Sequence, residues 1–480
     1  MRTIIHFRWL LALLLVLGSL SVAQATHMRG GDITYASIPA TTAGVPRYHV
    51  VVRNFYEIGS LVATPQTVAT ITASKVACAT GAPNAFMVQA PLTQTLNSSL
   101  LSCAVAGPLY LIALYEVDID LPAAQWTLST FVSARPAAIQ NLLNPAGQNC
   151  YLSAYLDNTT TTQDVSPVFQ SMVQPVFNFN ALTPFSFSAF DADGDSLRYE
   201  IIPAANTCST NVPTVPSNFV PHFTLNAATG MLTPTATSTT SQGYYNIVVR
   251  VSEYRKLAAN RWVLIGDVMR DTIYLLFPTG NQAPTFTTMQ VNGGAPQAPT
   301  SAIVALPGQT VNVVLQATDP DVGQVLRFVS PAAGVVPGLS LTPISGPIAT
   351  TQLTWQLPAA LPPGRYPVLV SVFDNGCTHN AYEERTILFL VGSNAALATR
   401  SGLLAAAEVY PTPFRDQVQF KTAPNQGVVL FDALGREVAR LTSAADGQVH
   451  WQPAPTLPAG LYLARSAASG QPIARLLRAE

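Results

Sequence analysis

Three aspartates at every second position, Asp191, Asp193 and Asp195, are the residues of this chain best suited to chemistry. Carboxylate oxygens are the ligands that calcium prefers, and calcium takes about six to eight of them. The sequence therefore predicts a calcium site here, completed by backbone carbonyls, water and either Glu253 or Asn281. An EF-hand is excluded, because its loop needs a glycine at position six and flanking helices, and this stretch has neither.

The elements that must position these carboxylates are two short strands. Residues 185–189 alternate Phe or Ala with Ser, which is the period of a half-buried strand, and residues 197–201 form the next strand. The aspartates then lie in a tight turn in which Gly194 supplies backbone freedom. One alternative stays open, since Asp and Gly also make an ordinary solvated hairpin turn that binds nothing.

The same pattern returns later in the chain. Asp319 and Asp321 repeat the Asp-x-Asp pair, although the third acid is missing, and Asp374 on the following strand is a further candidate ligand. Residues 243–253 match residues 364–374 without a gap, as Gly, Tyr, alternating Val and a final acid. Two signals in the same order indicate a duplicated module.

Composition favours an all-β fold of several domains. Of 480 residues, 48% are hydrophobic and only 10% are charged, and 38 prolines and 29 glycines break the chain into short β-branched runs. No stretch has sustained helical periodicity. The net charge of −1 without a basic run gives no reason to expect nucleic acid or an anionic membrane as a partner.

Enzymatic motifs are missing from the sequence. It contains no His-Glu-x-x-His, Gly-x-Ser-x-Gly, phosphate-binding glycine loop or Cys-x-x-Cys. We therefore expect a protein that is not an enzyme. The rival hypothesis is a carbohydrate-binding protein or a glycoside-active enzyme with its site in the N-terminal domain, and Trp262 beside Arg261 is a candidate sugar-stacking residue.

The N-terminus predicts export. Arg2 and Arg8 precede an apolar core, and residues 23–25 form the small-x-small pattern of a signal peptidase site. No later segment is long and apolar enough to span a membrane. Export permits disulfides among the five cysteines, and Cys78 with Cys103 is the first pairing to expect.

Two stretches of the body resemble known families. Residues 28–286, which include LPAAQWTLSTFVSARPAAIQNLLNP, YLSAYLDN and SPVF, resemble the N-terminal region of a large surface-protein family of Bacteroidota that has no established activity. That family usually has cysteines near the counterparts of Ser133 and Ala134, which this chain lacks. The two copies of the module resemble cadherin-like and other immunoglobulin-like sandwiches.

The C-terminal residues resemble the type A sorting domain of the type IX secretion system. Residues 410–414 (YPTPF), Asp432 with Gly435-Arg436, and residues 459–462 (AGLY) carry the match, with Thr412 where that family usually has Asn. The resemblance implies that the type IX machinery is a partner. It also implies that the mature chain is secreted to the outer-membrane surface or the medium.

These observations predict an all-β chain of tandem β-sandwiches. The expected parts are a signal peptide (1–25), an N-terminal β-rich domain (26–173), two immunoglobulin-like or cadherin-like modules (174–278 and 285–391), a linker (392–406) and a small sorting sandwich (407–480). The expected function is that of an adhesive or structural surface protein stiffened by calcium. Its ligand would be another protein or a glycan.

Overall fold

The computed structural model describes residues 28–57, 65–97, 110–172, 176–178, 183–215, 223–234, 242–258, 261–277, 280–346, 348–376, 380–392, 409–411, 413–432, 436–468 and 472–479. The expected signal peptide, Cys103, Cys377 and most of the expected linker lie outside these residues. The chain divides into two compact units, Met1–Ser393 and Asn394–Glu480. Among the described residues, no helix has the length and apolar character needed to cross a membrane.

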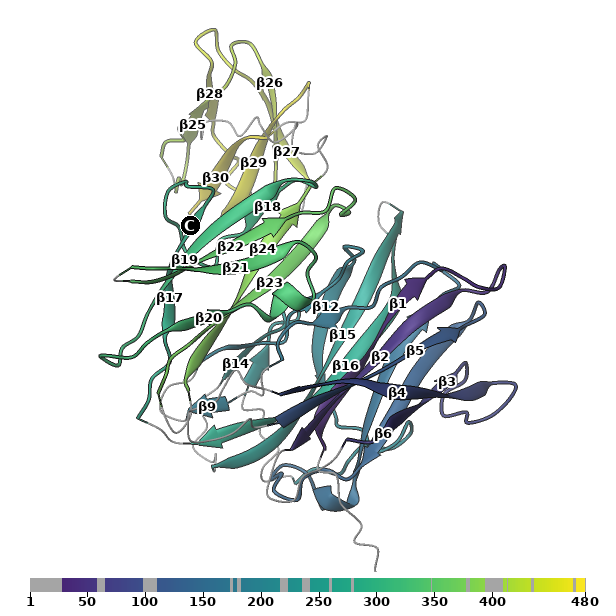
Figure 1. Ribbon diagram of the computed structural model, residues 1–480. Coiled ribbons are helices and arrows are strands. Elements are labelled where there is room, and N and C mark those ends of the chain that lie inside the picture. The colour runs from purple at the N-terminus through teal and green to yellow at the C-terminus, as the bar shows by residue number, and fades with distance from the viewer. Residues whose placement is uncertain are drawn as a thin grey trace, which may run out of the picture. The chain divides into compact units, whose positions relative to one another are not determined.

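Eight strands of the first unit pair in a closed ring (Figure 1). The pairing order is β1, β2, β5, β4, β3, β6, β7 and β16, and β16 pairs back with β1. Because side chains alternate along a strand, Tyr48, Val50 and Val52 of β2 all face the interior and are fully buried. The bounds are β1 (Met28–Ile38), β2 (Arg47–Glu57), β3 (Val68–Ser74), β4 (Ala85–Asn97), β5 (Tyr110–Asp120), β6 (Gln125–Ser133), β7 (Asn149–Asp157) and β16 (Arg261–Phe277), with the 3-10 helix η2 (Pro145–Gly147) before β7.

The first copy of the module is a sandwich that shares strands with this ring. One of its sheets has the order β9-β16-β15-β12 and the other has the order β10-β14-β13, while β11 pairs with β8. β16 belongs to both the ring and the sandwich, because it pairs with β15 along its length while its residues 266–268 pair with β7 and its residues 271 and 272 pair with β1. The boundary expected at residue 173 therefore does not separate two sheets. The strands are β8 (Val168–Phe169), β9 (Val176–Asn178), β10 (Phe185–Ser186), β11 (Ala189–Phe190), β12 (Ser196–Ile202), β13 (Phe223–Leu225), β14 (Met231–Pro234) and β15 (Gly243–Ala258).

The second copy of the module is a complete sandwich of two four-stranded sheets. One sheet has the order β17-β19-β22-β21 and the other the order β18-β24-β23-β20. Its β18 runs parallel to β24, as β9 runs parallel to β16 in the first copy, so the duplicated pattern corresponds to a repeated topology. The elements are β17 (Thr285–Val291), β18 (Ile303–Ala305), β19 (Thr310–Thr318), β20 (Arg327–Val329), η3 (Pro331–Gly334), β21 (Leu339–Ile344), β22 (Ala349–Gln356), β23 (Gly364–Phe373) and β24 (Tyr382–Val391).

The second unit is a small sandwich, as expected. Trp451, Tyr462 and Leu430 lie in its core, between a two-stranded sheet and a four-stranded sheet. The first sheet pairs β25 (Val418–Lys421) with β28 (Gln448–Trp451). The second has the order β27 (Glu437–Thr442), β26 (Gly427–Phe431), β29 (Gly460–Ser466) and β30 (Pro472–Arg478).

Alternation of apolar residues in the sequence predicts one core-facing side for each of β15, β19 and β23, and the structure confirms it. The inward residues of β15, β19 and β23 are each at most 5% exposed: Tyr245, Ile247, Val249, Val251, Val311, Val313, Leu315, Ala317, Tyr366, Val368, Val370 and Val372. The opposite face of β15 differs from expectation, because Asn246, Val248 and Ser252 are also buried. Ile139 and Leu142 pack on Val248, so a segment before η2 covers this face.

The two sandwiches of the first unit are packed together. Phe190 of β11 lies in the core of the second sandwich, 5.7 Å from the ring of Tyr366 and 6.4 Å from that of Trp355. Gln170 donates to the Pro367 carbonyl at 2.8 Å and accepts from the Leu369 amide at 2.9 Å. The sequence does not reveal this junction, because its contacts join residues almost 200 positions apart.

The disulfide expected between Cys78 and Cys103 is replaced by one between Cys78 and Cys208, whose Cα atoms are 5.4 Å apart. The segment after β12 folds back on the ring, where the Asn206 side chain accepts from the Asn149 amide of β7. That return brings Cys208 to the turn after β3. Cys150 is buried and free.

Candidate metal centre

The predicted acidic turn forms a buried cluster with two other segments of the first unit. Asp191 is 2% exposed, Asp195 is 8% exposed and Glu253 of β15 is fully buried. Asp164, from the segment after β7, is fully buried beside them. Carboxylate oxygens of Asp164, Asp195 and Glu253 lie within 4.8 Å of one another, the only such group of three acids among the described residues.

The turn has the local geometry that its sequence predicts. The Asp191 Oδ1 accepts the backbone amides of Asp193 at 2.9 Å and Asp195 at 3.2 Å, which is an Asx-type turn. Gly194 has a φ of +75°, a conformation that L side chains rarely adopt. The Asp193 Oδ2 accepts the Val165 amide at 2.9 Å and so connects the turn to the Asp164 segment.

Arg255 already supplies one positive charge to the cluster. Its Nη2 lies 2.8 Å from Asp164 Oδ1, 3.0 Å from Asp193 Oδ2 and 2.6 Å from Asp195 Oδ2. The same guanidinium donates to the Thr161 hydroxyl and to the Gln163 carbonyl, each at 3.1 Å. A planar guanidinium with five donors can bind several carboxylates in this way.

Two buried oxygens of the cluster have no hydrogen-bond donor among the described residues, and they belong to two carboxyl groups, Asp191 and Glu253, that interact with each other. Asp191 Oδ2 and Glu253 Oε2 are buried without a hydrogen bond among the described residues. The other Glu253 oxygen accepts from the Tyr35 hydroxyl at 3.0 Å. A buried carboxylate oxygen without a donor is costly, so these two atoms require a proton or a cation.

The pKa values move in the direction that this crowding predicts. Burial, followed by the neighbouring Asp164 and Asp191, raises the pKa of Glu253 well above its ordinary value. Burial, followed by Asp195, raises the pKa of Asp191 to about 7. Burial raises the pKa of Asp164 to about 6 even though Arg255 pulls it down. Each shift comes first from burial of the carboxyl group and then from the neighbouring acids, both of which disfavour the charged form.

The charge balance defines what the cluster can do. The cluster contains the five carboxyl groups of Asp164, Asp191, Asp193, Asp195 and Glu253, of which Asp164, Asp193 and Asp195 pair with its one guanidinium, that of Arg255. Without another cation, protons on Asp191 and Glu253 must remove part of the excess negative charge. With a hard divalent cation, the orphaned oxygens of these two residues become ligands, and the donor set is the all-oxygen set that calcium prefers.

The structure brings together Asp191, Asp193, Asp195 and Glu253 but places Asn281 elsewhere. Sequence reasoning missed two members of the cluster, Arg255 and Asp164. Arg255 had a signal, because it lies two residues beyond Glu253 on the same strand. Asp164 had none, since it comes from a loop whose position depends on the ring.

The second predicted set, Asp319, Asp321 and Asp374, lies in the second sandwich around Asn281. The side-chain amide of Asn281 donates to Asp374 Oδ2 at 2.9 Å. The backbone amide of Gln282 donates to Asp321 Oδ2 at 2.7 Å.

The acids of this second set also influence each other. The Asp319 Oδ2 is buried without a partner among the described residues, and burial raises the pKa of Asp319. Burial raises the pKa of Asp374 as well, with Asp319 as a smaller contribution. The set therefore resembles the first cluster, with fewer acids and with neutral amides in place of the arginine.

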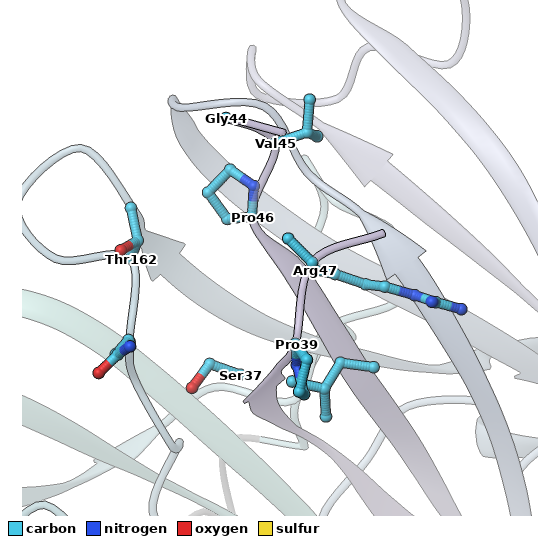
Figure 2. Close-up of a pocket in the computed structure, with 10 residues that line it drawn as sticks. Ser37, Pro39, Gly44, Val45, Pro46, Arg47 and Thr162 are labelled. Atoms are coloured by element: carbon cyan, nitrogen blue, oxygen red, sulfur yellow. The ribbon is translucent and has the colours of Figure 1, made fainter. Parts of the chain in front are cut away.

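A hollow of about 670 Å³ lies in the N-terminal region, where the rival hypothesis puts its site. Figure 2 shows Thr162 on one side of it and Ser37, Pro39 and Pro46 on the other, with the Arg47 side chain pointing away from Thr162. The ten residues lining it include no carboxylate. This hollow therefore lacks the acid pair that glycoside hydrolysis uses.

No protein-family model and no curated protein matches the chain. Solved structures with partial likeness include domains EC1-4 of Drosophila N-cadherin, at 12% identity and a TM-score of 0.21, covering 64% of this chain and 73% of that one. Human protocadherin-24 EC1-2 has 15% identity and a TM-score of 0.16, covering 48% and 99%. The N-terminal eight Ig domains of Down syndrome cell adhesion molecule have 10% identity and a TM-score of 0.17, covering 94% and 49%. Likenesses this weak give no activity or partner, and the all-β class is established by the strands themselves.

Proposed function

We propose that this chain is an exported surface protein with an adhesive or structural role, whose body is stiffened by calcium at the Asp191–Glu253 cluster. The observation that carries the proposal is the pair of buried oxygens on Asp191 and Glu253 that have no hydrogen-bond donor among the described residues, within a cluster of five carboxyl groups and one guanidinium. A divalent cation there would join β15, the acidic turn and the Asp164 segment. It would thereby lock the ring to the first sandwich.

A stiffening role agrees with where the cluster lies. The acidic turn also contacts the second sandwich, because a side chain added at Gly194 would meet the Tyr366 hydroxyl at 2.6 Å. Cation binding at this point would hold both sandwiches in one arrangement. A rigid array of strands whose loops vary suits a protein that presents a binding surface.

The calcium site is tested by calorimetric titration of the purified mature chain, together with thermal melts in calcium and in EDTA. We expect binding and a raised melting temperature, and both should be lost in Glu253→Gln and in Asp191→Asn. The matched control is Asp416→Asn, an exposed aspartate of the second unit. Absence of binding heat together with identical melts in calcium and in EDTA would contradict the proposal and leave a proton-stabilised cluster.

The proposed export route rests on the resemblance of residues 407–480 to type A sorting domains. Residues 26–480 behind the signal peptide should reach the surface or the medium of a host that has a type IX system. A chain ending at residue 406 should stay in the periplasm. Equal export of both chains would remove the sorting role from this unit without affecting the calcium proposal.

A further inference from the structure

A groove of about 760 Å³ lies between the two sandwiches of the first unit, separate from the hollow in the N-terminal region. One wall comes from the start of β12 and from the β13–β14 turn, and the other from β23 and β24. The tip of the β15–β16 hairpin contributes Trp262. This volume lies within the range of about 300–1,000 Å³ that is typical of ligand sites.

Trp262 offers an aromatic surface to the groove. Its side chain is 52% exposed, whereas the other described tryptophans, Trp126, Trp355 and Trp451, are at most 3% exposed. The Lys256 ammonium lies 5.8 Å from the indole centroid, which orients the ring and adds a positive charge. An exposed indole of this kind is suited to stack on the apolar face of a sugar ring.

The groove also carries one arginine without an ion pair among the described residues and a second arginine that is paired with an acid. Arg365 is exposed and has no ion pair among the described residues. Arg385 lines the groove as well, and its Nε is buried without a hydrogen-bond partner in the described part of the chain. The acids nearby are already engaged, since Asp195 pairs with Arg255 and Glu383 pairs with Arg385.

A polar side chain completes the lining. The carbonyl oxygen of the Asn226 amide accepts from the backbone amides of Ala228 and Thr229, at 2.9 Å and 3.2 Å. This fixes the side chain and leaves its amide nitrogen without a partner among the described residues. A fixed amide donor in the same groove as an exposed aromatic ring is suited to the hydroxyl groups of a saccharide.

We propose that this groove binds an acidic oligosaccharide, with a sugar ring stacked on Trp262 and a carboxylate or sulfate paired with Arg365. Guanidinium groups bind such anions through paired hydrogen bonds. The inference rests on the proposed surface-binding role, for which it names the class of ligand. It uses none of the candidate metal ligands except Asp195, which lines the groove while paired with Arg255.

The test measures binding to the mature chain by calorimetry, in calcium and again in EDTA. The probes are tetrasaccharides of galacturonate, alginate and chondroitin sulfate, with maltotetraose as the neutral probe and tetraglutamate as the acidic peptide. We expect one or more acidic tetrasaccharides to bind and the other two probes not to bind. Trp262→Ala and Arg365→Gln should each weaken that binding about 10-fold or more, which corresponds to about 1.4 kcal/mol.

Two exposed residues outside the groove provide matched controls, Phe131→Ala for the tryptophan and Arg475→Gln for the arginine. Unchanged affinity in these controls supports the groove as the site. The inference is overturned if no acidic saccharide binds, if the neutral sugar or tetraglutamate binds equally well, or if the groove variants bind like the controls. If an acidic saccharide binds in EDTA and calcium does not raise the melting temperature, the groove is supported and the calcium site is rejected. If calcium raises the melting temperature and no acidic saccharide binds, the calcium site is supported and the groove is rejected.

Discussion

At the scale of single residues, Arg255 decides whether the acidic cluster is tolerable in a folded chain. It is the one cation in hydrogen-bond contact with Asp164, Asp193 and Asp195 among the described residues, and Asp164 is fully buried. Removing one partner of a buried ion pair is strongly destabilising, because the other partner keeps an uncompensated charge. The positive charge of this residue therefore matters more to the fold than any one of the acids.

We predict that Arg255→Gln lowers the free energy of unfolding by about 3 kcal/mol in EDTA. Urea denaturation measures the difference. The control is Arg250→Gln, which breaks an exposed pair with Glu200 whose side chains are 39% and 49% exposed, and should cost under about 1 kcal/mol. Similar losses in both variants would show that the cluster does not depend on this guanidinium.

A second residue-scale prediction concerns Glu384 of β24, which is buried where the second sandwich meets β10 of the first. It accepts from the Ser186 amide at 3.0 Å and from the Ser171 hydroxyl at 2.8 Å. Burial raises the pKa of Glu384 from 4.5 to about 7, although these hydrogen bonds and Arg270 lower it. The folded chain therefore holds a proton here at pH values where the unfolded chain has released it.

The sign of the pH dependence follows from this difference in bound protons. The stabilising contribution of Glu384 is complete below about pH 4.5 and is lost as the pH rises through 7. We expect stability to fall more steeply from pH 5 to 8 in the parent chain than in Glu384→Gln, which cannot ionise. Urea melts in EDTA across this range measure both slopes, and parallel slopes would contradict the assignment.

Residue spacing predicted only part of the cluster. The alternating aspartates identify one turn, and the final acid of the repeat identifies Glu253, because both signals are local. Asp164 comes from a loop whose position depends on the ring, so no local pattern reveals it. The pairing of Cys78 with Cys208 was missed for the same reason, since 130 residues separate the two.

At the scale of elements, β16 makes room for the cluster. Gly266 lies opposite Glu253 in the β15–β16 register. A Cβ at this position would lie 1.8 Å from Glu253 Oε1 and 2.3 Å from the Tyr35 hydroxyl oxygen. The glycine therefore leaves the space in which the buried carboxylate and the tyrosine meet.

We predict that Gly266→Ala costs about 1–3 kcal/mol of stability, as overpacking typically does, and also weakens calcium binding. The control is Gly81→Ala, where an added Cβ meets nothing within 4 Å. Chemical denaturation and calorimetry give the two quantities. Unchanged calcium affinity in Gly266→Ala would mean that Glu253 is not a ligand.

The element scale is also where sequence reasoning was most successful. Period-two alternation predicted a buried face for each of β15, β19 and β23, because the apolar residues of these faces pack in a hydrophobic core. It failed for the second face of β15, since alternation assumes that water covers one side. Ile139 and Leu142 cover that side here. Because they come from a distant segment, the sequence of β15 alone does not indicate that this face is buried.

At the scale of the whole molecule, the first unit packs as one body from the ring to the second sandwich. Phe190 belongs by sequence to the first copy of the module but lies 3% exposed in the core of the second. Phe373 and Tyr382 of the second sandwich lie in the large core that begins at Met28. Each core therefore contains residues from the other, and neither can be exposed without opening both.

This exchange predicts that the described part of the first unit unfolds in one cooperative step. Phe190→Ala should lower its free energy of unfolding by about 3 kcal/mol or more, as deletion of a buried phenylalanine typically does. Hydrogen exchange should show a loss of protection in β23 and β24 and an equal loss in β1 and β16. Phe131→Ala, at a residue that is 63% exposed, should change the protection of neither set of amides by more than about 0.5 kcal/mol.

A loss confined to β23 and β24 would instead show that the second sandwich opens alone and that the shared residues do not couple the two cores. Full coupling would mean that a cation bound beside β15 stabilises the second sandwich as much as the ring, which a loosely tethered pair of domains could not do.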